Sequence, residues 1–368
     1  MWPASSKPTV ADDPDEDFLP LSWQYQDEVT DDDQPALDFW PVEERRRPDK
    51  LLIPLARAQD AVARLEAGVE GASPDVAVGL RARVSLHEAS GYLGHRHTTV
   101  HPRDLALHEA GLTGSYAAAS ILGTLANELP WSFANGMEPQ AAPKDWVVDQ
   151  AMHYARLWRQ LGALPSASRP DRWRGPLTLL GALTLTDDLL TDWADRLPNR
   201  TEAPGLVAAA EVTANGIPEQ GRRDHLDLPS TYVAACLWRL HGFGHAIALP
   251  FWSAPLSRID ALAQKTETEF QLSYLDCITE AALRARRELG VLQAAERKAT
   301  ALKSGGRSHL ASAVAFALRE PVVTARGLWE GIGISTRSAL DLLKRLVGEG
   351  LVREATGRSA WRAFVVEG

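Results

Sequence analysis

Hydrophobic residues recur at helical spacing along most of the chain. Between residues 51 and 69 (LLIPLARAQDAVARLEAGV), apolar side chains follow one another at alternating steps of four and three, which places them on one face of a helix. A second helix is expected over 75–93, and Ala- and Leu-rich segments recur near 114–128, 143–162, 174–195, 230–249 and 256–302. Alternating strand patterns are scarce in this region. The pattern predicts a mainly α fold.

Charge divides the chain into three parts. Residues 1–50 hold 14 of the 48 acidic and five of the 39 basic residues, so the formal charge of −9 belongs to this leader and the other 318 residues are neutral overall. A Lys-Ser-Gly-Gly-Arg hinge begins at residue 303, and the segment after residue 300 is basic. We therefore expect an acidic leader at 1–50, a helical body at 51–302 and a C-terminal domain at 303–368. The leader is expected to pack on the body, with competition against DNA at the C-terminal domain as the less favoured alternative.

The composition excludes several classes of protein. Hydrophobic residues make up 45% of the chain, enough for a sizeable core, yet no run of about 18 uncharged apolar residues is present to span a bilayer. The N-terminus lacks the basic patch and apolar stretch of a secretory signal, and two cysteines, Cys236 and Cys277, are too few for a disulfide framework or a zinc site. A protein of the reducing cytoplasm, with no membrane contact, fits these features.

The most specific pattern lies in residues 308–368. SHLASAVAFALRE predicts a short helix, Thr324 stands as the N-cap of a second helix, and Ser335 stands as the N-cap of a third, TRSALDLLKRLVGEG. The third helix places five apolar side chains on one face: Ala339, Leu342, Leu343, Leu346 and Val347. Two alternating segments, LVREAT and AWRAFVV, then flank a Gly-Arg-Ser turn as a hairpin. Helix, helix, turn, helix and hairpin is the order of a winged helix-turn-helix.

This order predicts contact with double-stranded DNA. A helix fits the major groove, and its N-terminal turn brings short polar side chains and free N–H groups to phosphates and base edges. Arg358 at the hairpin tip, with Arg362 beside it, would reach an adjacent backbone or minor groove. The predicted DNA-binding residues are Thr324, Arg326, Ser335, Thr336, Arg337, Ser338, Lys344, Arg345, Arg358 and Arg362. A winged helix retained for protein contacts is the alternative.

The residues from Arg319 to Val366 resemble the winged helix that closes many Fic-family proteins, in which a P-x-x-T start, an L-G-x-S turn and an E-x-T-G-R wing recur. Residues 51–69 resemble the opening helix of the Fic N-terminal region, and residues 80–109 resemble its following segment. Three positions match that segment: Arg83, Ser90 and Gly94. Leu93 stands where the family has its inhibitory glutamate. The chain also resembles a plasmid-borne group from rhizobia-like bacteria that pairs a domain of unknown function with this winged helix.

The resemblance implies a Fic-like helical body that has lost the chemistry of the family. A working Fic enzyme needs H-P-F-x-[DE]-G-N-G-R, in which the His is a base, the acidic residue binds the metal and the Gly-rich loop and Arg hold phosphates. The nearest stretch offers only the five residues from His241 to His245, HGFGH. We therefore expect no catalytic residue, no cofactor and no metal ligand. A diverged nucleotidyl transferase that uses His241 or His245 is the alternative.

Two other groups of residues favour a structural role. His95, His97 and His101 have spacings that a metal could use, but Pro102 breaks the local helix and no Cys or carboxylate cluster completes the set. The tryptophans of the body fall singly along helices, which favours core anchoring over base stacking.

The first hypothesis is therefore a cytoplasmic, sequence-specific DNA-binding regulator with a catalytically silent Fic-like body. The diverged transferase and a non-enzymatic protein-interaction module are the alternatives. The operator, the effector ligand and the oligomeric state, a homodimer included, stay open.

Overall fold

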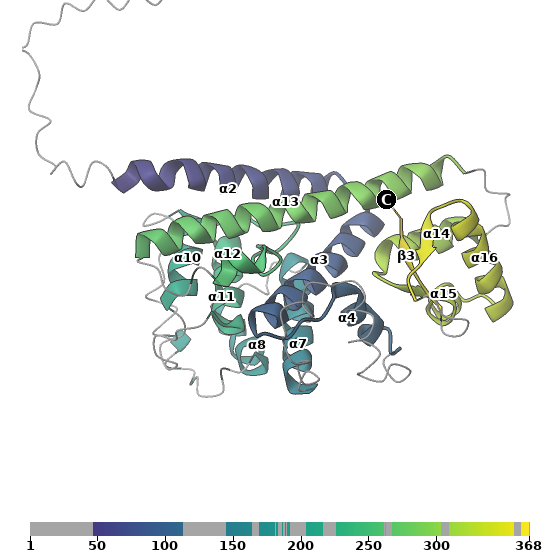
Figure 1. Ribbon diagram of the computed structural model, residues 1–368, viewed down its shortest axis with the longest axis horizontal. Helices are drawn as coiled ribbons and strands as arrows, with labels where there is room; N and C mark the ends of the chain where they lie inside the picture. Colours follow the sequence, from purple (N-terminus) through teal and green to yellow (C-terminus); the bar gives the residue numbers. More distant parts are fainter. Residues whose placement is uncertain are drawn as a thin grey trace, which may run out of the picture. The chain divides into compact units, whose positions relative to one another are not determined.

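The described part of the chain is mainly α, as predicted (Figure 1). The computed structural model describes residues 47–112, 145–163, 169–180, 204–215, 226–260, 267–302, 309–356 and 362–367, with single positions at 182, 186, 188, 190, 191 and 262. The predicted leader up to residue 46, the predicted helix at 114–128 and the hinge at 303–307 lie outside these residues. The chain from Pro48 onward forms one compact unit.

Two long helices open the body. Helix α2 (Arg47–Glu70) buries the predicted apolar face at Ala58, Val62, Leu65 and Val69. Helix α3 (Pro74–His95) begins at Ser73, whose hydroxyl accepts a hydrogen bond from the Val76 N–H at 3.3 Å, with a proline in its first turn. Buried residues occur along most of α3, so this helix is central to the packing of the body.

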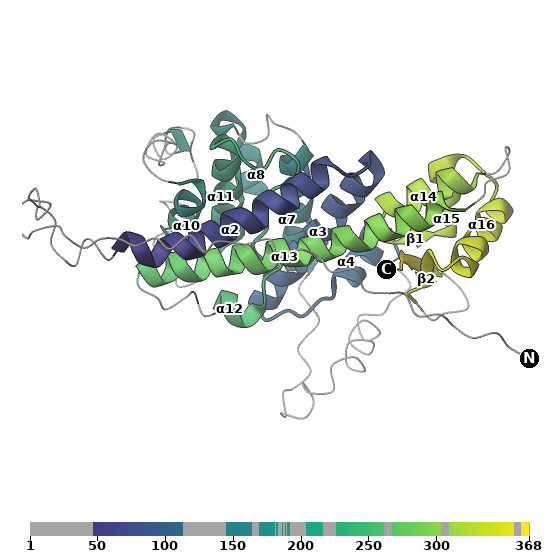
Figure 2. The same cartoon turned by 90° about the horizontal axis from the view of Figure 1, so that it is seen from above.

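Several other helices of the body pack against α3. Helix α7 (Asp145–Ala163) and helix α13 (Glu267–Thr300) both pack against α3, while α10 (Gly205–Asn215) packs against α11 (Leu228–Leu240). Shorter elements are α4 (Pro102–Glu109), the 3₁₀ turn η3 (Pro170–Arg172), α8 (Arg174–Leu179) and α12 (Leu256–Asp260). In Figures 1 and 2, α13 runs beside α2 and reaches the C-terminal elements, with which it is also in contact.

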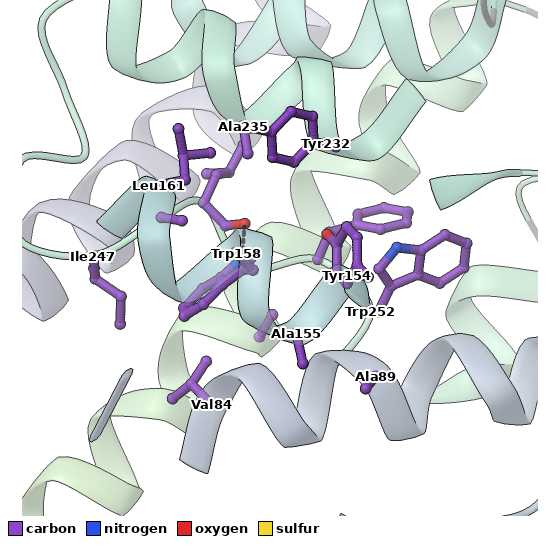
Figure 3. Close-up of a cluster of buried hydrophobic side chains, with 14 of the residues drawn as sticks. Val84, Ala89, Tyr154, Ala155, Trp158, Leu161, Tyr232, Ala235, Ile247 and Trp252 are labelled. Atoms are coloured by element: carbon purple, nitrogen blue, oxygen red, sulfur yellow. Dashed lines mark hydrogen bonds between the residues drawn. The ribbon is translucent and has the colours of Figure 1, made fainter. Parts of the chain in front are cut away.

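Aromatic residues of α7 anchor the body core. Trp158 and Tyr154 project from α7 among side chains of α3 and α11 (Figure 3), and the Trp158 indole N–H donates to the Leu249 carbonyl at 3.1 Å. The predicted core role is confirmed for four tryptophans, which are at most 2% exposed: Trp158, Trp173, Trp238 and Trp252. Burying a large apolar side chain contributes about 1.5 to 3 kcal/mol. These residues therefore stabilise the core of the body.

Some predicted helices are shorter than expected. The segment predicted over 230–249 forms α11 only to Leu240, because Gly242 (φ 88°) and Gly244 (φ 67°) adopt left-handed backbone angles that end a right-handed helix. The segment predicted over 256–302 is divided into α12 and α13. The segment predicted over 174–195 begins as α8, which ends at Leu179.

The C-terminal module, residues 309–367, combines helices with a small sheet. Its elements are α14 (Leu310–Arg319), β1 (Val323–Thr324), α15 (Ala325–Ile332), α16 (Thr336–Gly348), β2 (Val352–Glu354) and β3 (Ala363–Val366). The strands form an antiparallel sheet in the order β1-β3-β2, with Val323 opposite Phe364 and Arg353 opposite Val365. Strands β2 and β3 lie within the two predicted hairpin segments, whereas β1 was not predicted. Buried side chains of α14, α15, α16 and the sheet form a core that belongs to the module.

Candidate nucleic-acid interface

Both predicted N-caps of the C-terminal module are present. The Thr324 hydroxyl accepts from the Gly327 N–H at 2.9 Å, and the Ser335 hydroxyl accepts from the Ser338 N–H at 3.1 Å. Gly333, at φ 70°, supplies the left-handed residue of the turn between α15 and α16. These bonds satisfy N–H groups that have no partner inside the helix. Helices α15 and α16 therefore begin where the sequence predicts.

Helix α16 buries one face and exposes the opposite one. Ala339, Leu343 and Leu346 are at most 2% exposed within the core of the module. The predicted outward residues are all exposed: Thr336, Arg337, Asp341, Lys344 and Arg345. The prediction that Val347 belongs to the buried face is wrong, since its side chain is 41% exposed. Val347 lies eight residues after Ala339, and over this distance the helix turns its side chain about 80° away from the direction of the Ala339 side chain.

Three of the predicted DNA-binding cations lie beside carboxylates. Arg326 Nε is 2.8 Å from Glu330 Oε1, Lys344 Nζ is 4.0 Å from Asp341 Oδ1, and Arg362 Nε is 3.7 Å from Glu354 Oε1. The carboxylate of Glu330 raises the pKa of Arg326, mainly through its hydrogen bond. Exposed ion pairs of this kind hold their partners weakly. A phosphate is therefore able to replace each carboxylate.

Arg337 differs from these three cations. It lies in the first turn of α16, it is exposed, and within the described part of the chain no carboxylate lies within ion-pair distance of it. Ser335 and Ser338 flank it, and their hydroxyl oxygens lie 2.8 Å apart. The exposed first turn of α16 thus presents a cation and two hydroxyl groups to solvent.

The structure gathers only part of the predicted set into one groove. A groove of about 1110 Å³ is lined by five of the predicted residues: Thr324, Arg326, Thr336, Lys344 and Arg362. Ser335, Arg337, Ser338 and Arg345 do not line it. Arg358 lies outside the described residues.

The same groove has an apolar side that the sequence analysis did not anticipate. Trp329 of α15 and Leu340 and Val347 of α16 line it with exposed fractions of 37%, 47% and 41%. Glu109, the last residue of α4, and the three residues after it contribute to the wall of the groove. Large apolar side chains that remain exposed next to a polar surface are typical of contact sites.

The loop after α11 carries the two histidines of the alternative catalytic site. The N–H groups of Gly244 and Ala246 donate to the Glu66 carboxylate at 3.3 Å, and the His245 N–H donates to it as well. The Arg239 guanidinium donates to the Gly244 carbonyl of the loop and to the Leu161 carbonyl of α7, the latter at 2.6 Å. The N–H groups that would hold an anionic ligand here are therefore already paired with a carboxylate.

The three clustered histidines make separate local contacts. His95 Nδ1 lies 2.9 Å from Asp260 Oδ1, His101 Nδ1 accepts from the Arg103 N–H at 3.1 Å at the start of α4, and His97 is exposed with φ 57°. Among the described residues, no group of three or more His, Cys, Asp or Glu side chains is placed to hold a metal ion. No helix in the described ranges is both long and apolar enough to cross a membrane.

Glu88 of α3 is a buried residue that the sequence analysis did not single out. It is 0% exposed, and its carboxylate accepts from the N–H groups of Phe251, Trp252 and Ser253 at 3.0, 2.8 and 3.0 Å. Burial raises the pKa of Glu88, and the three backbone hydrogen bonds oppose this effect. Glu88 thereby fixes the loop that leads from α11 to α12.

Arg83 of α3 joins the body to the C-terminal module. Its guanidinium donates to the carbonyls of Leu318 at 2.8 Å, Ala317 at 3.2 Å and Glu320 at 2.8 Å, at the C-terminal end of α14. Burial lowers the pKa of Arg83 to about 10, against the opposing effect of nearby carboxylates, so the side chain stays charged at neutral pH. Gly79, one turn earlier, has no room for a side chain, because a Cβ there would lie 1.8 Å from the Leu318 carbonyl oxygen. Helix α14 is thus seated directly on α3.

Comparisons with known proteins add no family assignment. No protein-family model matches the chain, and no curated protein matches it at a significant level.

Proposed function

We propose that the chain is a cytoplasmic, sequence-specific DNA-binding regulator in which α14, α15, α16 and the small sheet act as a winged helix-turn-helix. In this proposal the remaining helices form a Fic-like body without catalytic activity, as the resemblance of the sequence implies. Helix α16 enters the major groove, with its first turn against the bases, and Arg358 and Arg362 reach the adjacent backbone or minor groove, as the sequence predicts.

One observation carries the proposal. Ser335 caps α16 so that Thr336, Arg337 and Ser338 form an exposed first turn, while three apolar side chains hold the opposite face of the helix in the core of the module. A rigid helix with a polar, cationic N-terminal turn has the chemistry that base edges and phosphates require. The absence of a carboxylate beside Arg337, within the described residues, leaves its guanidinium available for a bidentate contact with guanine.

Selection from a pool of random duplexes tests the proposal. The full chain is expected to enrich one sequence, and the Arg337→Ala variant is expected to bind with reduced preference for that sequence, losing about 1 to 3 kcal/mol of discrimination at one base pair. Arg57→Ala, which removes an exposed arginine from α2, is the matched control and should keep the preference of the wild type.

Two results would contradict the proposal. One is the failure of the full chain to enrich any sequence at low salt. The other is an equal enrichment by the wild type and the Arg337→Ala variant, which would show that the first turn of α16 does not read bases.

A non-enzymatic protein-interaction module is the second candidate, and the exposed Trp329, Leu340 and Val347 favour it. On this view the partner is a second copy of the chain, and Leu340→Asp should abolish self-association measured by analytical ultracentrifugation. Arg337→Ala should leave the self-association unchanged, which separates the two candidates.

A further inference from the structure

A second, smaller cleft lies where α3, α4 and α7 meet the end of α14. Its volume is about 480 Å³, within the range of about 300 to 1,000 Å³ that small-molecule sites occupy. Four alanines line it, three from the body helices and one from the C-cap of α4: Ala82, Ala106, Ala163 and Ala110. Because these side chains are short, the cleft has room for a small ligand.

Three arginines also line this cleft. Arg159 is already engaged, since it donates to both carboxylate oxygens of Glu109, at 2.9 and 2.7 Å, and to the Ser85 hydroxyl. Within the described residues, Arg319 of α14 forms one ion pair, at 3.5 Å with Asp75, and both side chains of this pair are partly exposed. Its guanidinium therefore retains donors for a ligand.

Arg81 is the third of these arginines, and its side chain is half-buried. Its guanidinium donates to the Ala246 carbonyl at 3.0 Å, and no carboxylate within the described residues lies at ion-pair distance from it. Partial burial lowers the pKa of Arg81, because desolvation disfavours its charge. A half-buried guanidinium with unused N–H donors binds an anion more strongly than a fully hydrated one does.

We propose that this cleft is a binding site for a small anion carrying a phosphate or carboxylate group, held by Arg81 of α3 and Arg319 of α14. Glu320 also lines the cleft. Because one cation belongs to the body and the other to the C-terminal module, the bound ligand would strengthen the packing of α14 against α3. This proposal does not rest on the DNA-binding function, because its test measures the binding of the ligand to the chain in the absence of DNA.

Titration of the full chain with pyrophosphate and with citrate, each compared with sodium chloride at equal ionic strength, tests the site. We expect saturable binding in a calorimeter for at least one of the two probes. Arg81→Gln should weaken that binding about tenfold or more. Hydrogen exchange of the backbone amides of Arg319, Glu320 and Val322 should slow when the ligand is bound, because these residues line the cleft.

Two further variants make the outcome decisive. Arg57→Gln, an equal change of charge at an exposed position of α2, should bind the anion as the wild type does. Arg319→Gln should weaken binding without touching the bond from Arg81 to Ala246, so it replaces Arg81→Gln if that variant is unstable. The proposal is overturned if neither probe binds beyond the chloride control, or if Arg57→Gln loses as much affinity as the cleft variants.

Discussion

Two glutamates in the body perform the same task at two places along the connection between α11 and α12. Glu66 of α2 accepts backbone N–H groups from residues 244–246, and Glu88 of α3 accepts those of residues 251–253. Each carboxylate thus supplies acceptors to a loop that has no helix or sheet partner for these N–H groups. Leaving a buried N–H without a partner costs about 1 to 3 kcal/mol. The irregular connection between α11 and α12 is therefore ordered by side chains from the two opening helices.

His87 of α3 makes the stability of the body sensitive to acid. Burial, with a smaller effect of the charges on Arg284 and His101, lowers the pKa of His87 to about 4 in the folded chain. In the unfolded chain this pKa is about 6.5, so between these values the unfolded state binds a proton that the folded state does not. We expect the free energy of unfolding to fall by up to about 3 kcal/mol as the pH decreases from 6.5 to 4.

Urea unfolding at a series of pH values measures this loss. His87→Gln should flatten the decrease between pH 6.5 and 4, with His309→Gln, at an exposed histidine, as the matched control. An unchanged slope in His87→Gln would show that His87 is not the group that responds to acid.

At the scale of the elements, the contact between α3 and α14 determines how the module is attached. We expect Arg83→Met to lower the free energy of unfolding by about 2 to 4 kcal/mol, because three carbonyls at the end of α14 lose their donors. The amides of α14 should also exchange faster with solvent, as mass spectrometry can measure. Arg83→Lys, which keeps the charge but not the planar set of donors, should have a free energy of unfolding between those of the wild type and Arg83→Met. Wild-type exchange rates in Arg83→Met would refute this role.

The sequence predicted elements better than it predicted contacts. Thr324 and Ser335 predicted where α15 and α16 begin, because an N-cap side chain bonds an N–H group within three residues of its own position. Strand β1 was missed, since its two residues are too short to show alternation and form a strand only by pairing with β3. Glu88 and Arg83 were missed as organisers of the structure for a similar reason: their partners lie more than 160 positions away in the chain. Such pairings follow from tertiary packing and leave no local pattern.

Within the candidate site, the sequence predicted the outward polar face of α16 but not the apolar side of the groove. The helical period places the polar residues of α16 on one face, which indicates that this face points outward. The exposure of Leu340 and Val347 depends on where the core of the module ends, and the period alone does not specify that limit.

At the scale of the whole molecule, charge governs any binding to DNA. The chain is acidic overall, and the basic residues of the C-terminal module are interspersed with carboxylates, so affinity should depend steeply on salt. We expect Lys344→Ala to lower the affinity for all duplexes and to flatten the slope of log K against log salt by about 0.9 for the lost phosphate contact. Fluorescence anisotropy between low and physiological salt measures both slopes. Identical slopes would place Lys344 away from the phosphates.

The reaction rates of the two cysteines with a thiol reagent report on the opening of the helical body. Cys236 of α11 and Cys277 of α13 are both 0% exposed, and burial raises the pKa of the Cys236 thiol, so neither presents a reactive thiolate to solvent. Residues 303–368 contain no cysteine. A thiol reagent will therefore not register the detachment of the C-terminal module, and its rate of reaction will report only the opening of the body. Labelling kinetics thus distinguish a chain whose module has come away from one whose helical core has begun to unfold.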